Sequence, residues 1–180
     1  EKLLDKRKNM SGGIGIGHTR WATHGEPNDI NAHPQFSNSK KLCLVHNGII
    51  ENYSTIKLKL IKEGFSFSSE TDTEVLVNLI EFVKKKNDVK LGEAVQIALN
   101  QVIGAYAIAV IDDEKPDEIV VAKLGSPLCI GIGEDEHFIG SDVTPFIEYT
   151  KDVVYLEDGE LAIIRNHKET FFRKIDDDSS

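Results

Sequence analysis

The sequence predicts an α+β fold in which helices cover sheets of largely antiparallel strands. Three segments place apolar residues at helical spacing, and eight short apolar runs alternate with turn residues as strands do. The last six runs follow one another with tight turns and no long helix between them, which indicates antiparallel strands rather than a βαβ series. The length of 180 residues fits one domain, and a hydrophobic fraction of 40% suffices for a core.

The predicted helices lie between residues 54 and 102. Residues 54–63 form the first, and they end before a glycine. The second begins at Thr71, which with Glu74 matches a capping box, and it ends at the basic triplet 84–86, a composition that suits a helix C-terminus. The third starts at Leu91 and repeats apolar residues along one face.

The predicted strands fill most of the remaining chain. They are residues 41–46, 105–112, 118–123, 128–133, 137–141, 152–156, 160–165 and 170–174. The run GGIGIG at residues 12–17 lacks the third glycine of the dinucleotide-binding fingerprint and the lysine of a P-loop. We therefore interpret this run as a strand that another backbone approaches closely.

Charge and hydropathy argue against several classes of function. The 21 Lys and Arg against 30 Asp and Glu give a net charge of −9, which disfavours a nucleic-acid partner. No apolar run approaches the ~20 residues of a membrane span, and the first ten residues lack the apolar centre of a secretory signal. Cys43 and Cys129 lie in apolar runs and are expected to be buried thiols. We expect a soluble, cytoplasmic protein without a membrane partner.

Four histidines gather in the first quarter of the chain, at positions 18, 24, 33 and 46. A metal-dependent hydrolase is one function that such a cluster suggests, and stoichiometric zinc in the purified chain would favour it. None of the pairs has the spacing of H-E-x-x-H, however, and no cysteine pair accompanies them. We therefore expect no metal and no cofactor, and predict that these imidazoles form hydrogen bonds with loops around a pocket.

The segment HTRWATHG at residues 18–25 concentrates polar groups that suit an anion. The planar guanidinium of Arg20 fits a carboxylate, and Thr19 or Thr23 offers a hydroxyl to the same group. An amino-acid or acyl carboxylate is one candidate ligand. The alternative is that Arg20 pairs with a structural carboxylate while Trp21 fills the core.

Two further positions allow both a structural and a chemical interpretation. Asn47-Gly48 is a common tight hairpin turn, but an Asn amide beside a Gly N–H also supplies the two donors that an oxyanion requires. Asp72 is an ordinary first-turn acid of a helix, but a carboxylate beside a pocket also suits an ammonium group. Together with Arg20, Asp72 would hold both charged ends of an α-amino acid.

Several longer motifs resemble one family in order and spacing, the glutaminase (class II glutamine amidotransferase) domain of glutamine–fructose-6-phosphate aminotransferases, also called glucosamine-6-phosphate synthases. Most of the chain takes part in the resemblance. The motifs are GIGHTRWATHGEPNDINAHP (15–34), VHNGIIENY (45–53), SETDTEV (69–75), GAYA (104–107) and GSPLCIGIGEDEHFIGSD (125–142).

The resemblance implies an N-terminal-nucleophile hydrolase fold, an αββα sandwich of antiparallel sheets, here truncated at the N-terminus. Residues 1–180 would be a partial type 2 glutamine amidotransferase domain, without its nucleophile segment and without the C-terminal isomerase domain. It implies that L-glutamine is hydrolysed through a thioester, and that the ammonia converts fructose 6-phosphate to glucosamine 6-phosphate in the isomerase domain, for hexosamine synthesis. The full-length enzyme is expected to be a homo-oligomer.

The resemblance also implies roles for the residues that bind glutamine. Arg20, with Thr23 and the backbone of His24, would bind the carboxylate, and Asp72 would bind the ammonium group. No metal is implied.

For catalysis, the resemblance implies that Asn47 and Gly48 form the oxyanion hole and that Trp21 gates the passage of ammonia. The family's nucleophile is a cysteine at the mature N-terminus, whose α-amino group acts as the base. Residue 1 here is Glu1, and both cysteines are internal. We therefore expect the polypeptide, as given, not to hydrolyse glutamine.

Two related functions remain as alternatives. One alternative is the glutaminase module of another amidotransferase, such as amidophosphoribosyltransferase. The motifs HTRWATHG and NGIIENY favour the hexosamine enzyme, and the acceptor domain would discriminate the two. A non-catalytic glutamine-binding module would keep the pocket without the nucleophile, and the codons upstream of Glu1 would discriminate.

Overall fold

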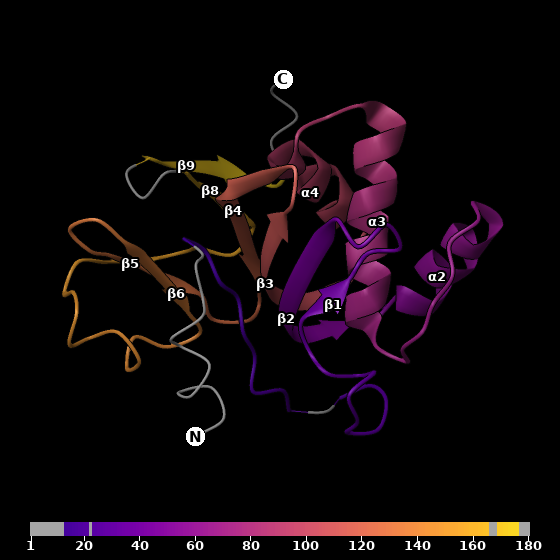
Figure 1. The fold of residues 1–180 in the computed structure, drawn as a ribbon, viewed down its shortest axis with the longest axis horizontal. Helices are drawn as coiled ribbons and strands as arrows, with labels where there is room; N and C mark the ends of the chain where they lie inside the picture. The colour runs from indigo at the N-terminus through magenta and orange to yellow at the C-terminus, as the bar shows by residue number, and fades with distance from the viewer. Residues whose placement is uncertain (1–12, 22, 166–168, 177–180) are drawn as a thin grey trace.

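Two antiparallel sheets and a group of helices form three layers (Figure 1). The computed structural model describes residues 13–21, 23–165 and 169–176. Within these residues, a six-stranded sheet has the order β1 (Gln35–Phe36), β2 (Leu42–Ile50), β3 (Gly104–Asp112), β4 (Lys115–Leu124), β8 (Glu160–Arg165) and β9 (Glu169–Lys174). A three-stranded sheet has the order β6 (His137–Gly140), β5 (Cys129–Ile132) and β7 (Val153–Tyr155). The neighbouring strands in both sheets are antiparallel, as predicted.

The helices pack on one face of the six-stranded sheet. They are α2 (Tyr53–Lys62), α3 (Asp72–Asn87) and α4 (Leu91–Leu99). The long helix α3 lies against β1 and β2, α4 lies against β4 and β8, and α2 packs on α3. These helices agree with the three that the apolar periodicity predicts, within a few residues at their ends.

The six-stranded sheet is buried on both faces, which explains why its central strands are apolar at nearly every position. In β3, Ile108 and Val110 belong to the core beneath the helices, whereas Ala107 and Ala109 belong to a second core. The second core also contains Ile130 of the three-stranded sheet. Because successive side chains in a strand point to opposite faces, one strand contributes to both cores.

The N-terminus of α3 is capped by one half of the predicted capping box. The hydroxyl of Thr71 accepts a hydrogen bond from the Glu74 N–H at 3.1 Å, as the box requires. The Glu74 carboxylate, however, accepts from the backbone N–H groups of Ser68 and Ser69, at 2.9 and 2.6 Å. It therefore also orders the loop that leads into the helix.

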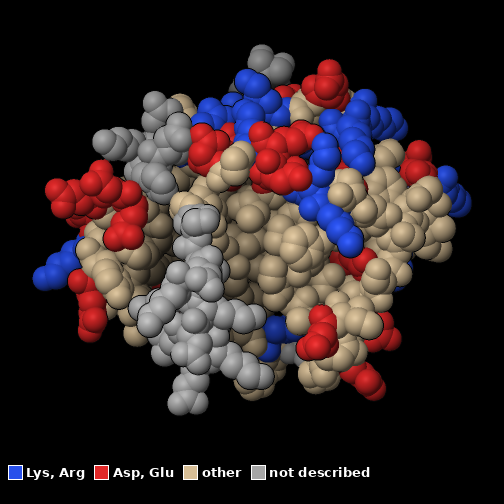
Figure 2. Space-filling view, viewed as in Figure 1, with Lys and Arg blue, Asp and Glu red and all other residues tan. Residues whose placement is uncertain are grey.

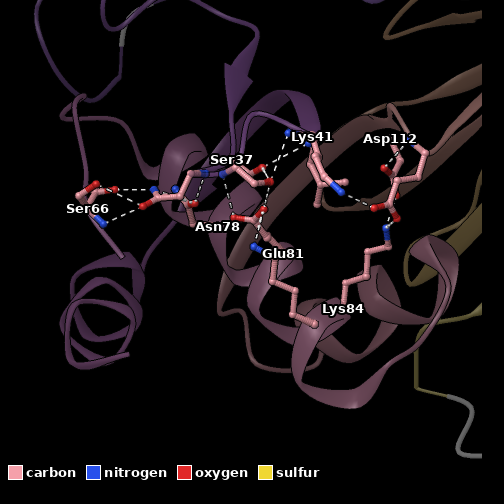
Figure 3. Close-up of polar contacts among 12 residues, drawn as sticks. Ser37, Lys41, Ser66, Asn78, Glu81, Lys84 and Asp112 are labelled. Atoms are coloured by element: carbon pink, nitrogen blue, oxygen red, sulfur yellow. Dashed lines mark hydrogen bonds and ion pairs between the residues drawn. The ribbon is translucent and has the colours of Figure 1, made fainter. Parts of the chain in front are cut away.

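Polar contacts attach the remainder of α3 to strand β3 and to the turns beside it and before β2 (Figure 3). Asn78, in the middle of the helix, accepts a hydrogen bond from the N–H of Asn38 at 2.8 Å. Near the end of α3, the Lys84 ammonium lies 2.6 Å from Asp112 and 2.7 Å from Glu114. The helix is thus fixed at both ends, and this fixes the position of its first turn.

Three features differ from the prediction. The two-residue strand β1 was not expected, because two residues carry no periodic signal. The strand predicted at 41–46 continues to Ile50. Residues 13–17 of the glycine-rich run are not a strand, and a Cβ on Gly15 or Gly17 would meet nothing within 4 Å, so the predicted close approach is wrong there. Residue 12 lies outside the described part of the chain.

The surface mixes charges of both signs. On the face shown in Figure 2, basic and acidic side chains alternate along the upper edge, and uncharged residues occupy the centre. Among the helices that the structure describes, none combines the length and the apolar character that crossing a bilayer requires.

Candidate functional site

A cavity of about 140 Å³ lies where residues 18–21, 23 and 24, strand β2 and the first turn of α3 meet. Its wall contains all the site residues predicted from the sequence, namely Arg20, Trp21, Thr23, His24, Asn47, Gly48 and Asp72. These residues are up to 52 positions apart in the chain (72 − 20). The fold therefore brings them together, as the hypothesis of a single amino-acid site requires.

Arg20 is held by backbone carbonyl groups rather than by a carboxylate. Its Nη2 donates to the carbonyls of His24 (2.6 Å) and Gly25 (3.2 Å), and its Nη1 donates to that of Glu26 (3.3 Å). A guanidinium has five N–H groups, and within the described part of the chain these carbonyls use three of them, which leaves the Nε–H and one Nη1–H. The backbone of Arg20 has a φ of 44°, a conformation that is uncommon for a residue with a side chain.

Trp21 does not fill the core, because 90% of its surface is exposed. The alternative interpretation of the segment 18–25, a structural carboxylate partner for Arg20 and a buried indole, is therefore wrong on the second point. As for a structural carboxylate partner, the hydrogen-bond partners described for the Arg20 guanidinium are the three carbonyls. Thr23 is also exposed at the cavity wall.

The loop that holds the guanidinium is anchored by Asn31, a residue for which the sequence analysis predicts no role. Asn31 is 2% exposed, and its Nδ2 donates to the Glu26 carbonyl at 3.0 Å and to Glu70 Oε2 at 3.2 Å. Its Oδ1 accepts from the Glu70 N–H at 3.0 Å. Asn31 thus connects the Arg20 loop to the segment that precedes Asp72. An isolated buried amide in a loop produces no periodic pattern that sequence reasoning could detect.

Asn47 and Gly48 lie inside β2, opposite Ala107 and Tyr106 of β3, so the hairpin-turn interpretation is wrong. Gly48 has a φ of 118°, and a Cβ at this position would lie 2.1 Å from the carbonyl oxygen of Ala105. Only glycine fits so close to the neighbouring strand. The backbone at this point is therefore displayed at the cavity wall without a side chain.

Asp72 is the first residue of α3, and its side chain is buried. Its Oδ2 accepts a hydrogen bond from the Ile50 N–H at 2.8 Å, which attaches the helix to the end of β2. Its Oδ1 lies 3.9 Å from His24 Nδ1, and its Oδ2 lies 3.9 Å from His46 Nδ1. The positive end of the helix dipole also favours a negative charge at this place.

His33 and His46 form hydrogen bonds at the cavity wall. His33 Nε2 and His46 Nδ1 both approach the hydroxyl oxygen of Thr73, at 2.8 and 3.2 Å. Burial, aided by the neighbouring His18, lowers the pKa of His33 to about 4, and burial also lowers the pKa of His46. Both rings are therefore neutral near pH 7. The residues that the structure describes contain no group of three or more His, Cys, Asp or Glu arranged to hold a metal ion.

Neither cysteine belongs to the cavity wall. Cys43 lies in β2 and Cys129 in β5, and both are buried. Burial raises the pKa of Cys43 to about 11 and also raises the pKa of Cys129. Because the thiolate is the nucleophilic form, these environments suit structural thiols rather than reactive ones.

A second cavity of about 600 Å³ adjoins the first and extends between the two sheets. Apolar side chains from β3 and β6, such as Ala109 and Ile139, contribute to its wall. The two cavities share four wall residues, which are His18, Trp21, His46 and Asn47. The exposed indole of Trp21 therefore stands at the boundary between a polar cavity and a larger, more apolar one.

Known proteins with the same domain match this chain along most of its length. The family model described as "Glutamine amidotransferase domain" matches residues 5–176. The chain is 62% identical over 163 residues to glutamine–fructose-6-phosphate aminotransferase (isomerizing) of Bacteroides thetaiotaomicron, in an alignment covering 91% of this chain and 26% of that protein. The chain spans about a quarter of the length of such curated relatives.

Two solved structures share the fold. Glutamine phosphoribosylpyrophosphate amidotransferase from B. subtilis, complexed with ADP and GMP, has a TM-score of 0.70 at 29% identity, covering 88% of this chain and 34% of that one. A glutamine aminotransferase class-II domain protein from Silicibacter pomeroyi has a TM-score of 0.62 at 16% identity, covering 82% and 72%. These neighbours confirm the predicted fold class.

Proposed function

The chain belongs to the glutamine amidotransferase domain family, and from this premise we propose that it binds L-glutamine in the 140 Å³ cavity and is the glutaminase part of a glutamine–fructose-6-phosphate aminotransferase (isomerizing). One observation carries the proposal. A guanidinium with two unused N–H groups, a buried carboxylate and two amide groups on a glycine-containing strand border the same small cavity. An α-amino acid with a side-chain amide presents the complementary groups.

Each predicted residue receives a role in this proposal. Arg20 binds the glutamine carboxylate with its free N–H groups, assisted by Thr23 and the backbone of His24. Asp72 binds the ammonium group; its position is fixed by the Ile50 N–H, so little reorganisation is needed.

The catalytic part of the proposal concerns the γ-amide of glutamine. The side-chain amide of Asn47 and the N–H of Gly48 donate to the oxyanion that forms when a nucleophile attacks this amide. By analogy with the family the nucleophile is a cysteine, and neither Cys43 nor Cys129 suits that role, because both thiols are buried and have raised pKa values. On this ground we propose that residues 1–180 alone do not hydrolyse glutamine.

The released ammonia must avoid water, where protonation would remove its lone pair. Trp21 stands between the two cavities, which supports a role as the gate for ammonia on its way to the acceptor. By analogy with the named relatives, the acceptor is fructose 6-phosphate on an isomerase domain, the product is glucosamine 6-phosphate, and the full-length enzyme is a soluble, cytoplasmic homo-oligomer.

The similarity to the phosphoribosylpyrophosphate enzyme supports the alternative of another amidotransferase less strongly, because its identity to this chain is 29% against 62% for the fructose-6-phosphate enzyme. Offering the full-length protein glutamine with either fructose 6-phosphate or phosphoribosylpyrophosphate discriminates the two. Formation of glucosamine 6-phosphate supports the main proposal, and ammonia transfer to phosphoribosylpyrophosphate overturns it.

Titration calorimetry of the 180-residue chain with L-glutamine tests the ligand. Asp72→Asn keeps the shape and removes the charge, and we expect it to weaken binding by about 10- to 100-fold, the value of a charge-assisted hydrogen bond. Asp29→Asn is the control, because Asp29 is exposed and absent from the cavity wall. The affinity of this variant for glutamine should equal that of the wild type. Absence of glutamine binding, or equal binding by Asp72→Asn, would overturn the assignment.

A further inference from the structure

We infer that His18 is a positioning residue that fixes which way the side-chain amide of Asn47 faces. The inference deepens the proposed function and rests on it, because the orientation matters only if Asn47 stabilises an oxyanion. It follows from two hydrogen bonds made by one imidazole ring.

The first hydrogen bond determines the tautomer of His18. The backbone N–H of Arg20 donates to His18 Nδ1 at 2.8 Å. A backbone N–H can only donate, so Nδ1 must be the unprotonated, accepting nitrogen. In the neutral ring the single proton then resides on Nε2.

The second hydrogen bond transmits this choice to Asn47. His18 Nε2 lies 2.6 Å from Asn47 Oδ1. A protonated Nε2 requires an acceptor, which is the oxygen of the amide. If the amide were rotated by 180°, two N–H donors would face each other at that distance. The ring therefore holds the carbonyl end of Asn47 toward itself and leaves the NH₂ end for another acceptor.

This orientation decides whether Asn47 favours or opposes an oxyanion. With the NH₂ group directed away from His18, Asn47 donates beside the N–H of Gly48 in the cavity wall. With the amide reversed, its oxygen would face the developing negative charge. Loss of one oxyanion-hole donor costs about 100- to 1,000-fold in rate, so an amide that spends time reversed loses much of its effect.

The ring of His18 is itself held from behind. The His33 ring stacks on it with centroids 4.6 Å apart and planes inclined by 25°. His33 is in turn fixed by its hydrogen bond to Thr73 of α3, at 2.8 Å. His18 thus receives support from the loop through Arg20 and from the helix through His33.

One consequence is a direct connection between the two ends of the glutamine site. The same residue whose guanidinium binds the carboxylate, Arg20, uses its backbone N–H to set the tautomer that orients Asn47. A shift of the Arg20 backbone therefore changes the oxyanion hole without any change at Asn47 itself.

Two substitutions separate the two contacts of His18. A glutamine amide nitrogen reaches about as far from the backbone as the imidazole Nε2, so His18→Gln keeps the donor to Asn47. An asparagine oxygen occupies about the place of Nδ1, so His18→Asn keeps only the acceptor for Arg20. His18→Ala removes both contacts.

The test measures glutamine hydrolysis by the full-length protein. We expect His18→Ala and His18→Asn to lower kcat by about 100-fold with less than about a threefold change in KM, and His18→Gln to recover to within about tenfold of wild type. A merely structural role predicts instead that all three variants lose activity in proportion to their loss of stability. Wild-type kcat in His18→Ala, or no advantage of Gln over Asn, would overturn the inference.

Nitrogen NMR of the 180-residue chain provides a test that needs no activity. The inference requires a pyrrole-type Nε2 and a pyridine-type Nδ1 in His18, and a scalar coupling across the hydrogen bond to Asn47. The opposite tautomer would overturn it even if glutamine is hydrolysed. Conversely, the expected tautomer together with an inactive full-length wild-type protein would refute the proposed function and not the geometry.

Discussion

Replacing Gly48 by alanine should be far more destructive than one methyl group suggests. The added Cβ would lie 2.1 Å from the Ala105 carbonyl oxygen and 2.7 Å from its carbonyl carbon, so β2 and β3 must separate by about 1 Å to restore ordinary contact. A side chain at a φ of 118° adds strain. Strain of about 1–3 kcal/mol and overpacking of about 1–3 kcal/mol together predict a loss of about 2–6 kcal/mol in the free energy of unfolding.

Urea denaturation of the 180-residue chain measures this loss. Alanine substitutions at two other glycines distinguish backbone strain from steric overlap. Gly64 has a φ of 90° with nothing within 4 Å of a Cβ, so Gly64→Ala should show strain alone, about 1–3 kcal/mol. Gly17→Ala meets neither obstacle and should stay within about 0.5 kcal/mol of wild type. A Gly48→Ala protein as stable as Gly64→Ala would show that the close approach of β3 is not what requires glycine.

Two more predictions concern the groups behind the site. Asn31→Ala removes one side-chain hydrogen bond to Glu26 in the Arg20 loop and two to Glu70, and calorimetry should show glutamine affinity reduced by about tenfold or more. Burial holds the pKa of His33 near 4, against 6.5 for an ordinary histidine, so the unfolded chain binds more protons between these values. The free energy of unfolding should therefore fall as the pH drops from about 6.5 to 4. After allowance for partial exposure of the ring, the free energy of unfolding should decrease by about 1–2 kcal/mol over this range. Urea denaturation at several pH values measures this decrease, which should be smaller in His33→Asn.

The predicted elements were found because their signals are local. Helix α3 has a cap at Thr71, an apolar stripe and a basic end, and each of these features is visible within one or two turns. Antiparallel pairing followed from short connections. The division into two sheets could not be predicted from periodicity. Strand β8 pairs with β4, although β5, β6 and β7, which form the second sheet, lie between them in the chain. Only the family resemblance implied two sheets.

The residues that line the site were predicted from the sequence, but the residues that hold them in place were not. Arg20, Asn47 and Asp72 belong to motifs whose residue types suggest an amino-acid ligand, and they do line one cavity. No role could be predicted for Asn31, because a single buried amide in a loop produces no periodic pattern. The hairpin interpretation of Asn47-Gly48 failed because β3 continues alongside and keeps both residues paired.

Hydrogen bonds join the three elements that surround the cavity, in addition to the apolar packing of α3 on β2. The Asp72 carboxylate joins α3 to the end of β2, Asn31 joins the loop to the segment before α3, and His18 joins the loop to β2. Together they form a closed triangle of three elements, so removing one connection loosens the geometry at the other two. Substitutions at these positions should consequently be non-additive, as for residues that share one network. Because the three connections depend on one another, a residue such as Asn31, which does not line the cavity, still affects the positions of the residues that do.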